Sequence, residues 1–166
     1  SIDFDNVSFK YEKDSEAYQL EDINLHIKSG ESIGILGPTG SSKSTLVQLI
    51  PRLYDISKGS LKVGGHDVKS YDLHTLRDAV SIVLQKNTLF SGTIADNLRW
   101  GDEHASDEEI RKAAQIAQAD DFVSQRNDSY ESKLGQGGSG VSGGQKQRLT
   151  IARSLLKKPK ILILDN

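Results

Sequence analysis

Alternating apolar and polar residues open the chain. Apolar residues alternate with polar ones from Ile2 to Tyr11, except for a phase slip at Asp5-Asn6. Alternation is typical of a strand that packs one face on a core, and a slip of this kind marks a bulge or a bend. Residues 23–27 alternate in the same way up to the turn at Ser29-Gly30. The two segments predict two strands.

Between residues 32 and 84, short apolar runs predict strands and apolar residues at helical spacing predict a helix. The run at residues 32–36 predicts a strand that enters a Gly-rich stretch, and apolar residues from Leu46 to Leu53 have the spacing of a helix. Residues 61–63 precede Gly64-Gly65, which is a hairpin signal, and residues 80–84 predict another buried strand. The stretch from Gly37 to Ser44 therefore joins a strand to a helix.

The second half of the chain contains two well-marked helices and a strand. Ser106 and Glu109 form an S-x-x-E capping box ahead of an apolar helical face. A Gly-rich stretch from residue 134 leads into a second helix, which Pro159 stops. The run Ile161–Leu164 ends in Asp165 and predicts a central parallel strand buried on both faces.

Composition narrows the classes of function. A chain of 166 residues corresponds to one domain, and its net charge of -2 provides no long-range attraction for nucleic acid or an anionic membrane. The chain has no cysteine, which excludes disulfides and thiolate metal sites. No apolar run approaches the roughly 18 residues of a membrane span, and no secretory signal is visible. Any anion site must be local.

Gly37 to Ser44 is the strongest candidate for such a site. It compares with the P-loop pattern G-x-x-x-x-G-K-S/T, in which backbone N–H groups at a helix N-terminus cradle phosphates. In that pattern Lys43 reaches the β- and γ-phosphates and the Ser44 hydroxyl binds Mg²⁺. Ser42 departs from the pattern, because it stands where the second glycine belongs and its Cβ restricts the backbone. A Gly-rich turn without phosphate chemistry is the alternative reading.

Two further features could complete a nucleotide site. Asp165 follows a buried strand, where a P-loop fold keeps the carboxylate that holds Mg²⁺, although many α/β strands end in Asp at a turn. Ser142, Gly143 and Gly144 place a hydroxyl and amides at a helix N-terminus, which makes a second anion site or else a Gly-rich cap. Two phosphate sites on one domain suggest a dimer whose halves exchange them.

Together these motifs resemble the nucleotide-binding domain of an ATP-binding cassette (ABC) exporter. The P-loop, the signature V-S-G-G-Q-K-Q-R and the strand I-L-I-L-D occur in the family's order, and the similarity covers essentially all 166 residues. The resemblance implies an α/β P-loop NTPase fold of the ABC type, with a mixed-sheet core, an antiparallel β subdomain and a helical signature subdomain. It also implies one domain over residues 1–166, with the helical subdomain at roughly 86–150 and the chain stopping after the Walker B strand.

The resemblance also assigns roles to individual residues. Tyr11 matches the aromatic that stacks on adenine, and Gln85 matches the Q-loop residue that touches Mg²⁺ and couples to the membrane domain. The alternatives are a buried strand Tyr and an ordinary surface Gln. The expected metal ligands are Ser44, Gln85 and Asp165, and the expected catalytic residues are Lys43, Gln85 and Asn166. The expected contacts to ATP are Tyr11, Gly37, Pro38, Thr39, Gly40, Ser41, Ser42, Lys43, Ser44, Thr45, Gln85, Ser142, Gly143, Gly144 and Gln145.

Two departures from the family pattern bear on catalysis. The family places a glutamate after the Walker B aspartate, and here that position is Asn166, which cannot accept a proton. A degenerate site of a heterodimeric exporter and an engineered replacement both account for it. The D-loop and switch histidine of the family would lie downstream, since all four histidines precede the signature.

The resemblance implies a function at the cytoplasmic face of the cell membrane. The stretch 87–98 and the loop 135–138 are similar to the multidrug or lipid exporter subclass. The expected partners are a transmembrane domain and a second nucleotide-binding domain, with no nucleic acid. The first hypothesis is an ATPase subunit that powers export through ATP-driven dimerisation; the alternative is a regulatory or degenerate half-site with little hydrolysis. A soluble cassette protein of translation or DNA repair fits the exporter-like loops less well.

Overall fold

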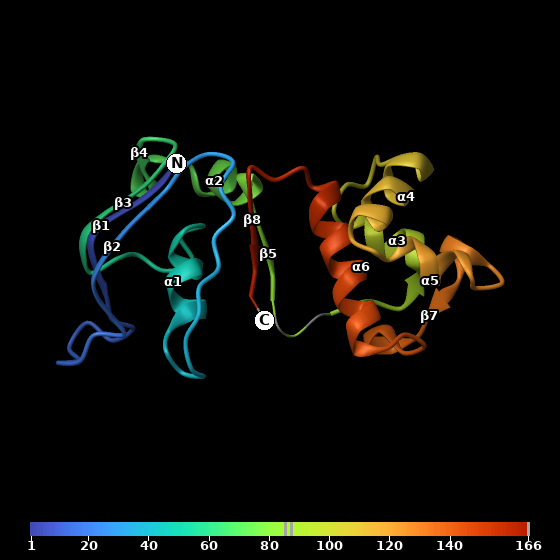
Figure 1. Ribbon diagram of the computed structural model, residues 1–166, viewed down its shortest axis with the longest axis horizontal. Coiled ribbons are helices and arrows are strands. Elements are labelled where there is room, and N and C mark those ends of the chain that lie inside the picture. The colour runs from blue at the N-terminus through green and yellow to red at the C-terminus, as the bar shows by residue number, and fades with distance from the viewer. Residues whose placement is uncertain (85, 87, 166) are drawn as a thin grey trace. The chain divides into compact units, whose positions relative to one another are not determined.

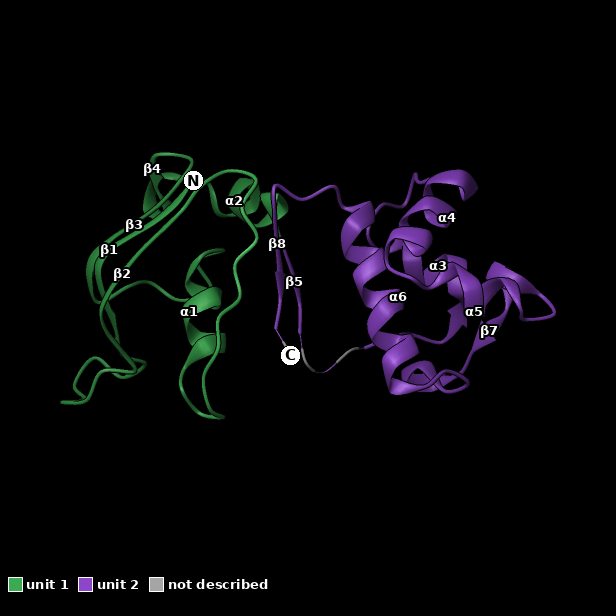
Figure 2. Ribbon diagram, in the orientation of Figure 1, with its two compact units in different colours: residues 1–80 green, residues 81–166 purple. Residues whose placement is uncertain are grey.

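The computed structural model describes residues 1–84, 86 and 88–165, and divides the chain into two compact units (Figures 1 and 2). The first unit is Ser1–Val80 and the second is Ser81–Asn166. Each unit has its own elements and is described separately. Among the described residues, no helix is long and apolar enough to span a membrane.

The first unit is built around an antiparallel sheet. Its strands are β1 (Ile2–Phe9), β2 (Leu20–Ile27), β3 (Lys58–Val63) and β4 (His66–Asp67), in the order β2-β1-β3-β4. The predicted bulge is confirmed, because the register of β1 against β2 shifts between Phe4 and Val7 and Asn6 has a positive φ of 47°. A Cβ on Gly59 would lie 2.3 Å from the Asn6 carbonyl oxygen, so the bulge requires glycine on the neighbouring strand.

Helices complete the first unit. They are α1 (Lys43–Leu49), the 3-10 turn η1 (Val68–Ser70) and α2 (Leu73–Ala79). Apolar spacing predicted that the first helix would continue toward Leu53, but α1 ends at Leu49. Arg52 has a positive φ of 55°, which is incompatible with a right-handed helix.

The strand predicted at residues 32–36 is not formed. These residues have no regular structure, and Leu36 is 96% exposed. A strand is stabilised by backbone hydrogen bonds to a neighbour. Within residues 1–80, the described strands pair only among β1 to β4 and leave this run without a ladder. The prediction from its apolar composition was therefore wrong for the structure of this unit.

The second unit consists mainly of helices on one apolar core. Its helices are α3 (Ile94–Arg99), α4 (Asp107–Ile116), α5 (Asp120–Ser124) and α6 (Gly143–Leu156), with 3-10 turns η2 (Ser129–Glu131) and η3 (Gln136–Gly138). The core includes Leu98, Ile110, Ala114 and Leu149, all nearly inaccessible. The predicted Ser106–Glu109 capping box at the start of α4 is confirmed.

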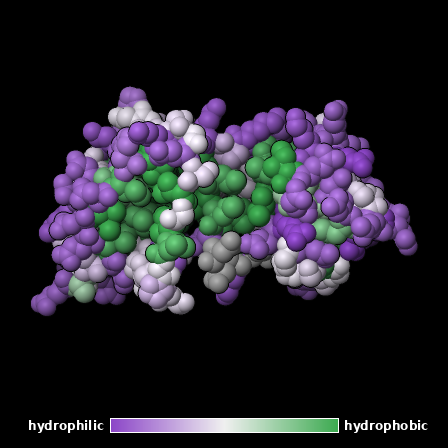
Figure 3. All heavy atoms as spheres, in the orientation of Figure 1, coloured by the Kyte–Doolittle hydropathy of each residue, from purple (hydrophilic) through white to green (hydrophobic). Residues whose placement is uncertain are grey.

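Two short sheets belong to the second unit. Strand β6 (Gly92–Thr93) pairs with β7 (Lys133–Leu134), and β5 (Val80–Val83) pairs with β8 (Ile161–Leu164). The prediction that β8 is buried on both faces was wrong, because Leu162 and Leu164 are 39% and 51% exposed and only Ile163 is buried. Figure 3 shows apolar side chains at the surface over this strand. A strand in a two-stranded sheet has fewer neighbours than the central strand that the apolar run predicted.

Candidate nucleotide-binding site

The phosphate-binding candidate of the first unit is the loop Gly37–Ser42 followed by α1. Lys43 is the first helical residue, and its ammonium group lies against the loop. Its Nζ donates to the carbonyl oxygens of Gly37 at 2.7 Å and Pro38 at 2.9 Å, and to the Ser41 hydroxyl at 3.3 Å. A cation inside a concave, Gly-rich loop at the start of a helix suits a polyphosphate. The described residues therefore fit the phosphates of a nucleotide.

The loop is tightly curved around this lysine. A Cβ on Gly37 would lie 2.6 Å from the Ser41 hydroxyl, so a larger residue at position 37 would collide with the opposite side of the loop. Gly40 has a positive φ of 83°. Gly37 is the first glycine of the P-loop pattern, and Gly40 stands at one of the pattern's variable positions.

Ser42 adopts the backbone conformation that the pattern reserves for glycine. Its φ of 62° and ψ of 22° are left-handed, and it is the N-cap residue of α1 without a side-chain cap hydrogen bond. Its hydroxyl instead donates to the Gln19 amide oxygen at 3.4 Å. For an L-residue this conformation costs roughly 1–2 kcal/mol, so Ser42 keeps the loop geometry at an energetic cost that glycine would avoid.

Tyr11 lies next to the helix that follows the loop. Its hydroxyl shares a hydrogen bond of 2.8 Å with the hydroxyl of Thr45, which is buried in α1. Its ring makes edge contacts with Phe9 and Tyr54, at centroid distances of 4.9 and 5.1 Å. Half of Tyr11 is exposed, so a fixed aromatic surface stands beside the phosphate loop. This geometry suits stacking on a planar base. The half-exposed ring does not match the alternative interpretation, in which Tyr11 is a buried residue of a strand.

The signature residues of the second unit form a capped helix N-terminus. Ser142 is the N-cap of α6: its hydroxyl accepts from the Gln145 backbone N–H at 3.2 Å, and the Gln145 side chain accepts from the Ser142 backbone N–H at 3.0 Å. A Cβ on Gly143 or Gly144 would meet nothing within 4 Å. Both glycines are exposed, and the first turn of a helix leaves N–H groups without helical partners, so this end of α6 is accessible to an anion.

The loop ahead of the signature packs on the core of the same unit. Gly138 is buried, and a Cβ there would lie 2.9 Å from the Cβ of Leu89. The Gly135 N–H donates to the Ser139 carbonyl at 3.1 Å and closes the loop on itself. The two stretches that the sequence associated with exporters, near residues 89 and 135–138, are thus in contact.

Of the three candidate magnesium ligands, the structure describes two, Ser44 and Asp165, which belong to different units. Asp165 is partly exposed and its N–H donates to the Val83 carbonyl at 2.9 Å, so it lies where β8 and β5 end together in the second unit (Figure 1). Ser44 belongs to the first unit, and the predicted roles of Gln85 and Asn166 lie outside the described residues. In the described part of the chain, no three His, Cys, Asp or Glu residues gather as a metal site.

An interaction network around Arg153 was not predicted from the sequence. Arg153 of α6 donates to the carbonyls of Asn97 at 2.9 Å and Thr88 at 3.1 Å, and burial lowers its pKa. Asn97 is buried and its side chain bonds both backbone groups of Phe90. Phe90 stacks on Trp100 at 4.6 Å, and both rings are exposed. A buried Asn inside a helix gives no distinctive sequence signal, so only the structure reveals this network.

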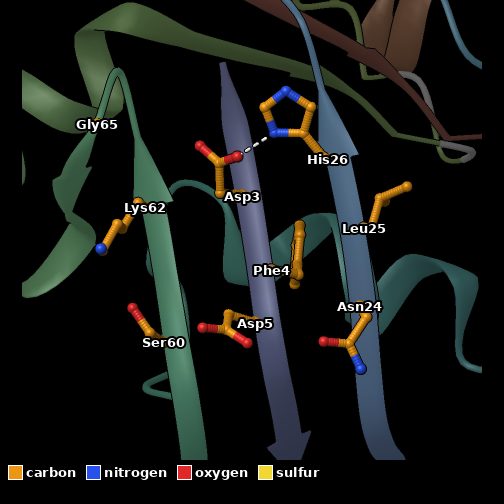
Figure 4. Close-up of a pocket in the computed structure, with 9 residues that line it drawn as sticks. All are labelled: Asp3, Phe4, Asp5, Asn24, Leu25, His26, Ser60, Lys62 and Gly65. Atoms are coloured by element: carbon orange, nitrogen blue, oxygen red, sulfur yellow. Dashed lines mark hydrogen bonds and ion pairs between the residues drawn. The ribbon is translucent and has the colours of Figure 1, made fainter.

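A surface groove in the first unit is separate from these candidates. It lies on the polar side of the antiparallel sheet and contains the paired side chains of Asp3 and His26, with Lys62 across the neighbouring strand (Figure 4). None of the predicted nucleotide contacts lines it. The groove therefore does not contribute to the nucleotide site.

Comparisons with known proteins identify relatives of this chain. The sequence model of the ABC transporter family matches residues 20–166. A multidrug export ATP-binding/permease protein of Staphylococcus aureus is 46% identical over 164 residues, which is 99% of this chain and 28% of that protein. The Bacillus subtilis protein YgaD, with the same description, shows the same identity and coverage. A solved bacterial Atm1-family ABC exporter with ATP bound superposes with a TM-score of 0.90 at 37% identity, over 98% of this chain and 28% of that one.

Proposed function

Because this chain belongs to the ABC transporter family, we propose that it binds ATP with Mg²⁺ and powers export by closing onto a second nucleotide-binding domain. The chain spans 28% of the length of the curated relatives it matches, so export and its partners are proposals for the whole protein. The main observation that supports this proposal is the Gly37–Ser42 loop, which is folded around the Lys43 ammonium group. The relatives are named as multidrug export ATP-binding/permease proteins, which supports the same assignment.

Each residue of the proposed site has a defined chemical role. ATP supplies the phosphoanhydride bond and Mg²⁺ neutralises part of its charge, with Ser44, Gln85 and Asp165 as the proposed ligands. Lys43 exchanges the loop carbonyls for β- and γ-phosphate oxygens, since a phosphate is a stronger acceptor than a carbonyl. Tyr11 stacks on the base, while the open amides of Gly143 and Gly144 in a second copy receive the γ-phosphate.

A binding experiment with two variants tests this proposal. Titration of the full chain with ATP should give saturable binding, and Lys43→Ala should lose one to two decades of affinity, because a charge-assisted contact contributes about 1.5–3 kcal/mol. Ser142→Arg should leave that affinity unchanged and abolish the ATP-induced dimer measured by light scattering. Affinity within twofold of the parent for Lys43→Ala, or an intact dimer for Ser142→Arg, would overturn the corresponding assignment.

The partner proposed for the second unit is the transmembrane region of the exporter, at the cytoplasmic face of the membrane. The exposed Phe90–Trp100 stack supports this, because Arg153 and Asn97 hold it rigidly and exposed aromatic pairs mark interaction surfaces. These 166 residues contain no cysteine, so Trp100→Cys provides a single attachment point within this chain for a thiol crosslinker, in a transporter whose other cysteines are replaced. Crosslinks in the complete transporter should reach its transmembrane region; crosslinks only within this chain would refute the docking.

A second candidate function is a half-site that binds ATP with little hydrolysis. Two features favour it. Asn166 follows Asp165 at the position where the resemblance to the family implies a glutamate, and Ser42 in the phosphate loop has a left-handed backbone. Measuring ATP affinity and phosphate release on one sample separates the two functions. Release at a rate typical of transport ATPases would exclude the binding-only function.

A further inference from the structure

We propose that Arg126 is a positioning residue for the signature loop, defined here as residues 135–141, which lead into Ser142. The inference rests on the proposed function of Ser142 as a contact to a nucleotide held by a second copy. It concerns a residue outside the P-loop and the signature motif. The evidence for the inference is the geometry around Gly140.

Arg126 reaches the signature loop from a different part of the second unit. Its guanidinium NH1 donates to the Gly140 carbonyl at 3.1 Å, across a sequence separation of 14 residues. Gly140 lies two residues before the N-cap Ser142. The hydrogen bond therefore acts on the segment that sets where the signature helix begins.

The base of the Arg126 side chain is well anchored. The Arg126 backbone N–H donates to the carbonyl of Val123, which is fully buried in the helical core, and the Arg126 carbonyl accepts from the Ser129 N–H at 3.0 Å. The residue itself is half-buried. A side chain rooted in this way transfers the rigidity of the core to the loop that it contacts.

Arg126 contacts an exposed part of the loop, which lies between the buried Gly138 and Val141, a partly buried residue that packs on the core. Gly138 is buried against Leu89, whereas Gly140 is exposed and has a positive φ of 100°. Glycine in an exposed loop has wide backbone freedom, which a hydrogen bond from outside the loop restricts. Arg126 thus limits motion between the packed Gly138 and the capped Ser142.

The positive charge of Arg126 suits the same role. Among the described residues, no ion pair with a carboxylate neutralises it, in contrast to Arg111, which pairs with Asp120 at 3.4 Å. A guanidinium left without a carboxylate near a helix N-terminus increases the local positive potential for an arriving γ-phosphate.

Arg126→Leu tests the inference, with Arg111→Leu as a matched control from the same unit. Both variants should unfold at about the parent temperature and bind ATP at the P-loop with unchanged affinity. In the full chain, Arg126→Leu should accelerate amide hydrogen exchange across residues 139–145 and weaken ATP-driven dimerisation by roughly 3–10-fold, the effect of one lost hydrogen bond. Arg111→Leu should change neither quantity.

The outcomes separate this inference from the proposed function. If the parent dimerises with ATP and Arg126→Leu matches it in both exchange and dimer affinity, the positioning role is overturned. If the parent binds ATP without dimerising, the hydrogen-exchange data still decide whether Arg126 orders the loop. In that case the proposed contact of Ser142 with a nucleotide held by a second copy is wrong. Equal acceleration in Arg111→Leu would also contradict the positioning role.

Discussion

A single side chain in the phosphate loop, Ser42, has a consequence for nucleotide affinity. Its left-handed backbone is the conformation that glycine adopts at little cost, and its Cβ adds bulk where phosphate would approach the loop amides. We expect Ser42→Gly to raise ATP affinity about 3–10-fold by removing the Cβ from the approach to the loop amides, and to increase the free energy of unfolding by roughly 1 kcal/mol by relieving the backbone strain. Isothermal titration with ATP measures the affinity directly.

Ser42→Ala provides the control, because it keeps the Cβ and the strained backbone but removes the hydroxyl that contacts Gln19. It should gain no affinity. If Ser42→Ala binds ATP as tightly as Ser42→Gly, the hydroxyl and its contact with Gln19 would be responsible, and the explanation from the Cβ would be wrong.

At the scale of elements, the start of α4 makes stability depend on pH. The Ser106 backbone N–H and the Lys158 ammonium group lower the pKa of Glu109 from 4.5 to about 2. A carboxyl whose pKa is lower in the folded state stabilises the fold above its unfolded pKa, and this contribution is lost as pH falls toward the folded pKa. The contribution of Glu109 should therefore disappear between about pH 4.5 and pH 2.

The variant Glu109→Gln isolates this effect, since glutamine can still accept the capping hydrogen bond but carries no charge toward Lys158. Urea unfolding of parent and variant should show the parent more stable at pH 7, with a difference that shrinks to near zero at about pH 2. A difference that stays constant across this range would mean that the charge of Glu109 does not stabilise α4.

The elements also show how far the sequence predicts the structure. The capping box at Ser106 and the bulge at Asn6 could be predicted, because both depend on residues a few positions apart. The lack of a strand at residues 32–36 could not be predicted, because an apolar run does not specify whether a neighbouring strand is available to pair with it.

The candidate site follows the same rule. The Lys43 loop and the Ser142 cap are contiguous motifs and were predicted, although the capping box between Ser142 and Gln145 was not. The contacts from Arg126 to Gly140 and from Arg153 to Asn97 join residues 14 and 56 positions apart. No local pattern encodes contacts of that separation, so they required the structure.

At the scale of the whole molecule, the residues that we propose for nucleotide binding and for turnover belong to different parts of the chain. The P-loop lies in the first unit, whereas Asp165 and the signature lie in the second. We propose that turnover requires both, and additionally a group that accepts a proton from the attacking water. In this sequence the position after Asp165 carries an asparagine, whose amide can orient water but cannot accept its proton.

Asn166→Glu should therefore increase phosphate release without improving ATP affinity, because general-base assistance typically contributes about 10²–10⁴ in rate. The assay requires the complete transporter, with the second nucleotide site disabled so that only this site turns over, and Asn166→Gln serves as the uncharged control of equal length to Glu. Phosphate release should rise in Asn166→Glu alone. If phosphate release stays at the parental rate while ATP still binds, Asn166 does not limit this site.

The double variant Ser42→Gly with Asn166→Glu then tests whether the strained loop limits turnover instead. Relief of that strain would raise phosphate release only in the double variant.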